Sequence, residues 1–292
     1  MEQMPYYLPP EEGWKKHFEG LIPIVVLILI AIVLVGKTTT YFCTVPGLSD
    51  VFCGSGKIKV GLLGSFGTET NTEVKANLLK AVLDAEGGKF NIYTSPIVVG
   101  ALEYPQQNLL KPYNIVVVAG QQNLSYAARM ALGNYVAAGG KVILIGDAAV
   151  RDSADPLVKG WSAATFGDYA PVRLSVSGPI PGNAFPRKMI TSVQLNYFID
   201  TNPIIKDYAD AYQLNFSELS SAPSCQDINA IDVVPLGDMI ATLSSADGSN
   251  FVPAIVEKKG AGLGAGTVLY FDYDPGCTRA AVITTIKYLA GK

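Results

Sequence analysis

The stretch from Tyr113 to Val150 reads YNIVVVAGQQNLSYAARMALGNYVAAGGKVILIGDAAV and carries most of the information on fold class. It opens with an apolar run, Tyr113–Gly120, of the kind found in strands buried on both faces of a parallel sheet. A helical pattern over 125–138 follows, Gly139-Gly140 ends it, and a second apolar run begins at Lys141. A strand, a helix and a strand in this order predict a right-handed β-α-β unit.

Similar patterns flank this unit. The run IKVGLLG at 58–64 predicts a strand, and the capping-box spacing of Thr70 and Glu73 predicts that a helix follows. GTVLYFDYD at 266–274 predicts a last strand before a closing helix over 278–289. We therefore expect an α/β fold over 57–292: a flavodoxin-like, open, mostly parallel sheet with helices on both faces. The stretch 151–227 holds seven of the 13 prolines found in 57–292, together with alternating segments, which predict an antiparallel elaboration of the same domain.

Composition excludes several classes of function. The chain has 292 residues, of which 49% are hydrophobic and 16% are charged, and its net charge of -3 gives no electrostatic footprint for nucleic acid. The only histidine, His17, rules out a His-based triad or a multi-His metal site in the body of the protein. The glycine-rich loop Gly260–Gly266 has the wrong spacing and the wrong place for a dinucleotide site. We expect no cofactor and no metal.

The most apolar stretch is LIPIVVLILIAIVLVG at 21–36, which has lysines on both sides. It predicts a transmembrane signal anchor, with a cytoplasmic leader at 1–20 and a juxtamembrane loop at 37–56. A buried core helix and a cleaved signal peptide are the alternatives. This interpretation places the protein in the cell membrane as a single-pass chain, with its main domain outside the cytoplasm and the membrane as a partner.

All four cysteines follow the apolar stretch, which agrees with disulfides in an oxidising compartment. Three connectivities are open, and we favour pairing Cys43 with Cys53 and Cys225 with Cys277. Free buried thiols are the alternative. Two Asn-x-Ser triplets, at Asn123 and Asn215, are candidates for glycosylation.

The segment from Tyr113 to Ala149 resembles the central unit of the class I glutamine amidotransferase-like superfamily, especially its trehalose-utilisation-like and membrane-anchored branches. Asn202-Pro203-Ile204 resembles the family's His-Pro-Ile turn with Asn in place of His, and 253–276 resembles its closing pair of strands. An active member carries Cys on a tight turn after a strand, with His and a carboxylate downstream. Here that turn is Ala119-Gly120-Gln121-Gln122 and no His follows, so the resemblance implies a chain without catalysis.

Ligands of open α/β sheets bind beyond the carboxyl ends of the strands, where the strand order reverses. The sequence brings polar or flexible residues to several of those ends, where carboxylates suit a hydroxyl group or a cation. Structural loop or capping roles are the alternative. The candidate ligand-binding residues are Ser65, Gly67, Gly120, Gln121, Asp147, Asp272 and Asp274.

Three functions remain open. The first is a catalytically inactive, membrane-anchored domain that binds or assembles with protein partners, or with itself, in the cell envelope. The second is a pilin-like filament or surface-layer subunit processed after Gly20, because the apolar stretch that follows resembles the start of archaeal pilins. The third is a glycan-acting hydrolase that uses carboxylates at the strand ends.

Overall fold

The computed structural model describes part of the chain, and its contacts divide the chain into two units, Met1–Lys57 and Ile58–Lys292. The architecture below is that of the second unit. The described residues are 23–28, 31, 56–66, 76–104, 108–154, 157–158, 160–161, 167–176, 180–181, 186–198, 202, 204, 220–261 and 264–291.

An eight-stranded sheet organises the domain, in the order β11-β14-β15-β16-β5-β3-β1-β2. The strands from β16 to β2 are parallel, and β15, β14 and β11 are added antiparallel at one side. The predicted mostly parallel sheet is confirmed. The bounds are β1 (Ile58–Gly64), β2 (Ile92–Ile97), β3 (Ile115–Ala119), β5 (Lys141–Ile145), β11 (Gln194–Tyr197), β14 (Asp238–Ser244), β15 (Phe251–Lys259) and β16 (Thr267–Phe271).

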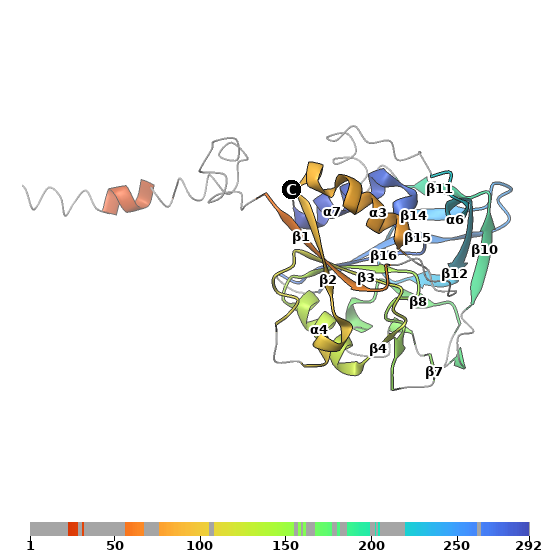
Figure 1. Ribbon diagram of the computed structural model, residues 1–292, viewed down its shortest axis with the longest axis horizontal. Coiled ribbons are helices and arrows are strands. Elements are labelled where there is room, and N and C mark those ends of the chain that lie inside the picture. Colours follow the sequence, from red (N-terminus) through yellow and green to blue (C-terminus); the bar gives the residue numbers. More distant parts are fainter. Residues whose placement is uncertain are drawn as a thin grey trace, which may run out of the picture. The chain divides into compact units, whose positions relative to one another are not determined.

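Helices cover both faces of this sheet (Figure 1). On one face lie α3 (Asn77–Glu86) and α7 (Arg279–Ala290), and on the other lies α4 (Tyr126–Ala137). Strand β3 shows why the sequence specifies this arrangement, since every residue of β3 is buried. Alternate side chains of a strand point to opposite faces, so Val117 packs in the α3/α7 core and Val118 in the α4 core.

Short two-stranded ladders, three antiparallel and one parallel, include the described strands of the predicted elaboration apart from β11, which joins the main sheet. Their elements lie between β3 and β14, and one α-helical turn and four 3-10 turns complete the described domain. The ladders pair β4 (Asn123–Leu124) with β6 (Arg151–Asp152), β7 (Leu157–Val158) with β9 (Ile180–Pro181), β8 (Val172–Leu174) with β13 (Val233–Pro235), and β10 (Arg187–Thr191) with β12 (Asp227–Ile231). The turns are α6 (Pro223–Gln226), η2 (Gly87–Phe90), η3 (Val99–Glu103), η5 (Gly167–Tyr169) and η6 (Pro275–Cys277).

One predicted disulfide is present. Cys225 of α6 is bonded to Cys277 of η6, with their Cα atoms 5.6 Å apart. The bridge ties the elaboration to the segment that leads into α7. Cys43 and Cys53 lie outside the described residues, so their pairing stays a prediction.

The predicted membrane localisation is wrong on the described residues, because none of their helices is long and apolar enough to span a bilayer. Within the predicted span at 21–36, helix is described at 23–28 and at 31. The remaining residues of the span lie outside the described part.

Candidate functional site

The strand order reverses between β1 and β3, which is where the sequence predicts a ligand crevice. The two strand ends touch there. The backbone N–H of Ser65 donates to the carbonyl of Ala119 at 3.0 Å. Gly120 has φ +58°, and a Cβ atom on it would lie 2.6 Å from the Ser65 carbonyl oxygen. Direct backbone contact therefore fills the switch point, while Ser65 itself is exposed and Gly67 lies outside the described residues.

The turn after β3 is bonded to the turn after β5. The side-chain Nε2 of Gln121 donates to the backbone carbonyl of Asn123 at 2.6 Å. The backbone carbonyl of Gln121 accepts from the backbone N–H of Ala149 at 2.8 Å. The neighbouring Gln122, which the sequence did not single out, donates its side-chain Nε2 to Oδ2 of Asp147 at 2.6 Å. Both glutamines thus fasten adjacent turns to each other.

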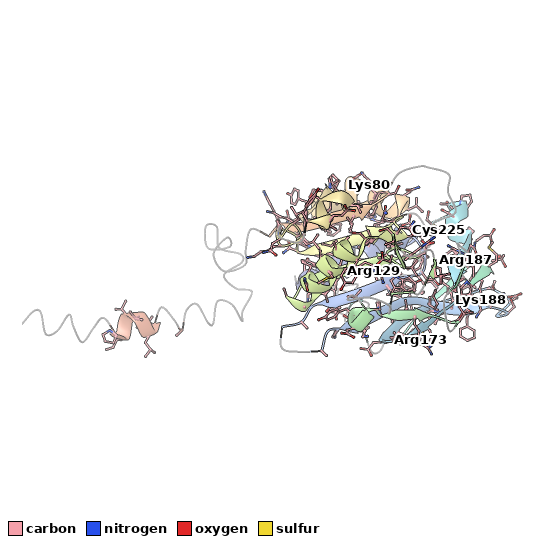
Figure 2. The ribbon with its side chains drawn as sticks, turned by 90° about the horizontal axis from the view of Figure 1, so that it is seen from below. Lys80, Arg129, Arg173, Arg187, Lys188 and Cys225 are labelled. Carbon is pink, nitrogen blue, oxygen red and sulfur yellow. A yellow bond between two sulfur atoms is a disulfide. The ribbon has the colours of Figure 1, made fainter. Side chains whose placement is uncertain are left out.

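Asp147 lies at the carboxyl end of β5 and is completely buried. Its Oδ2 also accepts from Nη2 of Arg187 on β10, at 2.8 Å. Arg187 extends from the end of the domain that carries Lys188 and Cys225 (Figure 2). Burial raises the pKa of Asp147, while the charge of Arg187 and the amide of Gln122 oppose that shift. The buried Oδ1 atom accepts no hydrogen bond from any described residue.

Asp272, at the end of β16, is also completely buried. Its Oδ1 accepts from the backbone N–H of Ile231 at 3.0 Å and from the hydroxyl of Tyr270 at 2.9 Å. Burial raises the pKa of Asp272 well above its usual range, and the negative charge of Asp147 adds to the shift. The two strand-end carboxyls therefore belong to one electrostatic cluster, as their positions in the sequence predict.

Trp161 closes the cluster from the elaboration. Its buried ring packs edge-on against Tyr270, with ring centroids 5.6 Å apart. Its indole N–H donates to the carbonyl of Ala148 at 2.8 Å. The acid cluster consequently has an aromatic cover and no opening to solvent at Asp147 or Asp272.

Asp274 serves a different purpose, because it caps α3 from 196 positions away. Its two carboxylate oxygens accept from the N–H groups of Leu78 and Leu79 at 2.8 and 2.9 Å, and Oδ1 also accepts from Gly276. Ala76, the N-cap residue directly before α3, has no side chain that could accept a hydrogen bond from the first turn. A carboxylate at a helix N-terminus satisfies free N–H groups and complements the helix dipole, so Asp274 has a structural role.

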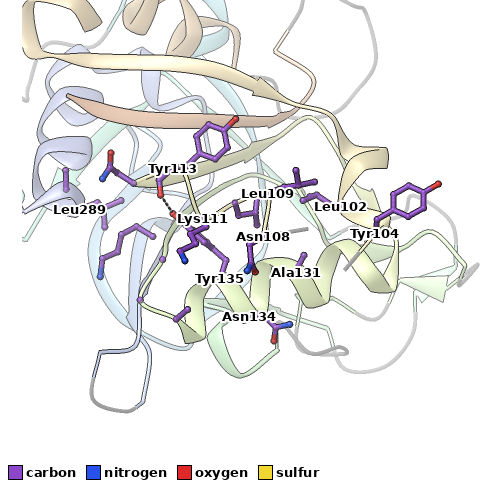
Figure 3. A pocket seen from close by; sticks show the side chains of 17 residues that line it. Leu102, Tyr104, Asn108, Leu109, Lys111, Tyr113, Ala131, Asn134, Tyr135 and Leu289 are labelled. Atoms are coloured by element: carbon purple, nitrogen blue, oxygen red, sulfur yellow. Dashed lines mark hydrogen bonds between the residues drawn. The ribbon is translucent and has the colours of Figure 1, made fainter. Parts of the chain in front are cut away.

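An open pocket of the described domain lies at the opposite edge of the sheet (Figure 3). Its cavity measures about 610 Å³ and is formed where β3 and β5 begin and where α4 and α7 end. We call it the amino-edge pocket. Its lining residues are Leu102, Tyr104, Asn108, Leu109, Leu110, Lys111, Tyr113, Asn114, Ala131, Asn134, Tyr135, Ala138, Gly139, Gly140, Lys141, Leu289 and Ala290.

Comparison with known proteins relates the chain by fold alone. No protein-family profile matches the sequence, and no curated protein matches it. The β-galactosidase of Rahnella sp. R3 shares the fold, with a TM-score of 0.51 and 13% identity over 82% of this chain and 33% of that chain. The cytoplasmic protein STM3548 of Salmonella typhimurium matches with a TM-score of 0.49 and 12% identity, over 79% of this chain and 98% of that one. A ThuA-like protein of Parabacteroides merdae matches with a TM-score of 0.43 and 14% identity, over 81% and 91% of the two chains.

Four residues of the acid cluster escaped the sequence analysis: Gln122, Trp161, Arg187 and Tyr270. Tyr270 had a usable signal, since it stands two positions before Asp272 on a buried strand and therefore faces the same side of the sheet. Gln122 is the last residue of the turn that the sequence did single out, although it was not named as a site residue. No signal in the sequence indicated Trp161 and Arg187, because their contacts depend on how the elaboration folds back over the sheet.

The described residues contain no group of three or more His, Cys, Asp or Glu side chains placed to hold a metal ion. Of the two candidate glycosylation positions, Asn123 is exposed on β4 and Asn215 lies outside the described residues. The hydroxyl of Ser125, the third residue of the first triplet, accepts from the N–H of Ala128 and caps α4.

Proposed function

We propose that this domain acts by binding and does not catalyse a reaction at the carboxyl edge of its sheet. One observation carries the proposal: each of the strand-end carboxylates is bonded to groups of the domain itself. Asp147 is held by Gln122 and Arg187, Asp272 by Ile231 and Tyr270, and Asp274 by the first turn of α3.

The burial of the acid pair argues against a hydrolase. A glycosidase places two carboxyl groups on either side of the bond that it cleaves, so a substrate must reach both of them. Asp147 and Asp272 are each 0% exposed. Burial alone accounts for the direction in which the pKa values of both groups are shifted, so these shifts are no sign of a catalytic role.

The turn after β3 supports the same conclusion. In the superfamily that the sequence resembles, this turn carries the cysteine nucleophile, whereas here it is Ala119-Gly120-Gln121-Gln122, without Cys. The Ser65 carbonyl lies where a side chain on Gly120 would begin. A side chain on Gly120 would therefore require the strand ends to move apart.

The amino-edge pocket supplies what a binding domain needs, namely a solvent-accessible concave site. Its cavity of about 610 Å³ lies within the range of about 300–1,000 Å³ of small-molecule sites. The pilin-like alternative depends on Gly20 and the residues after it, most of which lie outside the described part, and it stays a prediction.

An activity assay with matched variants tests the proposal. The full chain is incubated with L-glutamine and, because one structurally similar protein is a β-galactosidase, with 4-nitrophenyl β-galactoside. We expect the same rates for the wild type, for Asp147→Asn and for Asp272→Asn, all equal to the buffer blank. Turnover by the wild type that is lost in a folded Asp147→Asn or Asp272→Asn variant contradicts the proposal.

A further inference from the structure

We infer that the amino-edge pocket binds a hydroxylated organic anion of the size of a mono- or disaccharide, such as a sugar acid. The inference rests on the proposed function, because it names the class of ligand that the binding domain takes. It concerns the edge of the sheet opposite to the acid cluster, where the sequence analysis placed no site.

The turn at Tyr113 and Asn114, which lines the pocket, is held by hydrogen bonds to three neighbouring elements. The hydroxyl of Tyr135, on α4, donates to the carbonyl of Tyr113 at 3.0 Å. The hydroxyl of Tyr113 accepts in turn from the hydroxyl of Ser95 on β2, at 3.2 Å. The Asn114 side chain accepts from the N–H of Lys59 on β1, at 2.8 Å. Strands β1 and β2 and helix α4 thus fix the same turn, and a preformed site loses little conformational entropy on binding.

The turn before β5 contains Gly139 and Gly140, which also line the pocket. A Cβ atom on Gly140 would collide with the ring of Tyr135. The absence of a side chain at this position lets the ring lie across the turn and form one wall of the cavity (Figure 3). Together with Leu109 and Leu289, this wall gives the pocket an apolar part.

The positive charge of the pocket favours a negatively charged ligand. Two lysines, Lys111 and Lys141, line it, and its lining contains no Asp and no Glu. Within the described part of the chain neither ammonium group forms an ion pair. Positive charge that no described residue balances attracts an anion.

The polar groups select a hydroxylated ligand. Asn108 and Asn134 are exposed at the pocket and have side-chain amides, which both donate and accept hydrogen bonds. A hydroxyl group has the same dual character, so amides and hydroxyls pair in either direction. The rings of Tyr104 and Tyr113 offer amphipathic surfaces for the carbon skeleton of such a ligand.

The test is a titration of the full chain, labelled with nitrogen-15, by glucuronate and by its neutral counterpart glucose. We expect glucuronate to shift the backbone amide resonances of Lys111, Asn134 and Gly140 in a saturable way, with a Kd on the order of 1 mM or tighter. We expect glucose to bind at least about fivefold more weakly, because it lacks the charge that the lysines attract.

Three variants make the test specific. Lys111→Gln should weaken glucuronate binding about threefold to fivefold, the range of a partly solvated ion pair. Asn134→Asp has almost the same shape as the wild type and should weaken it further by repelling the anion. Lys80→Gln is the control, since Lys80 pairs with Asp84 on α3 and does not line the pocket.

The inference is overturned if glucuronate causes no saturable shift, if the shifts fall outside the amino-edge pocket, if glucose binds equally well, or if Lys80→Gln weakens binding as much as Lys111→Gln. Each of these results leaves the activity assay unchanged. Conversely, hydrolysis that depends on Asp147 refutes the proposed function whatever the pocket binds, so the two failures are distinguishable.

Discussion

Arg187 donates a hydrogen bond to the carboxylate of Asp147 across 2.8 Å, although the two residues are 40 positions apart in the chain. Asp147 stands at the end of a central parallel strand and Arg187 on the β10/β12 ladder. The arginine side chain is 19% exposed and the aspartate side chain 0% exposed. This pair therefore fastens the elaboration over the edge where the sequence predicts a ligand.

Replacing the cation should leave a buried carboxylate without its charge partner. We expect Arg187→Gln to lower the free energy of unfolding by about 2–3 kcal/mol, near the lower limit for broken buried ion pairs because Arg187 is partly exposed. Urea denaturation measures this loss. Arg173→Gln, an exposed arginine on β8, is the control and should change stability little.

A double variant separates the ion pair from simple loss of packing. If the loss comes from the unpaired charge, adding Asp147→Asn to Arg187→Gln should restore part of the stability. Equal losses in the single and double variants would show that the arginine acts only by filling space.

Asp274 should behave as a helix cap. We expect Asp274→Ala to lower the free energy of unfolding by about 1–2 kcal/mol, because the N–H groups of Leu78 and Leu79 lose their acceptors. Hydrogen exchange at these two amides should accelerate as well. Asp238→Ala, an exposed carboxylate at the start of β14, is the matched control. Unchanged exchange at Leu78 and Leu79 would refute the capping role.

Gly120 has a left-handed backbone conformation and also lies close to the Ser65 carbonyl. A comparison with Gly248 separates the cost of backbone strain from the cost of this contact. Gly248 has φ +72° with nothing within 4 Å of an added Cβ atom, so Gly248→Ala should cost about 1 kcal/mol from backbone strain alone. Gly120→Ala adds the contact with the Ser65 carbonyl and should cost clearly more. Equal losses of unfolding free energy would mean that the strand ends part readily.

Asp272 should make stability depend on pH. Burial raises its pKa in the folded chain well above the usual value, so over the interval between the two pKa values the folded chain holds a proton that the unfolded chain has released. The free energy of unfolding then falls as pH rises above about 4, by up to about 1.4 kcal/mol per pH unit for this group.

The variant Asp272→Asn isolates this effect. It cannot ionise, and its side-chain oxygen still accepts from Ile231 and Tyr270. Relative to the wild type it should therefore gain stability as the pH rises above about 4. Urea denaturation at several pH values measures the difference, and parallel curves for the two proteins would contradict the assignment.

Much of the sheet could be predicted because its strands are apolar runs buried on both faces. Ile58–Gly64, Ile115–Ala119, Lys141–Ile145 and Thr267–Phe271 all lie where the sequence indicates strands. The convergence of Asp147 and Asp272 follows from the same pattern, since carboxyl ends of parallel strands share an edge. The antiparallel hairpin of β14 and β15 turns at Asp247-Gly248, a dipeptide typical of such turns.

What escaped prediction depends on contacts between distant parts of the chain. The sequence indicated a local capping box at Thr70 and Glu73, which lie outside the described residues, whereas α3 is capped by Asp274. It gave no sign that Arg187 and Ile231 would bond the strand-end carboxyls. Long-range polar pairs leave no periodic pattern, so nothing in the sequence indicated that Asp147 and Asp272 are completely buried.

Carboxyl labelling of the folded chain tests most directly whether the strand-end acids are sealed. A carbodiimide with glycine ethyl ester, followed by peptide mass spectrometry, reports which carboxyl groups are accessible. We expect Asp168 and Asp238, which are exposed, to be modified, and Asp147 and Asp272 to be modified only after unfolding in urea. Modification of Asp147 and Asp272 in the folded protein at the rate of Asp238 would contradict the account.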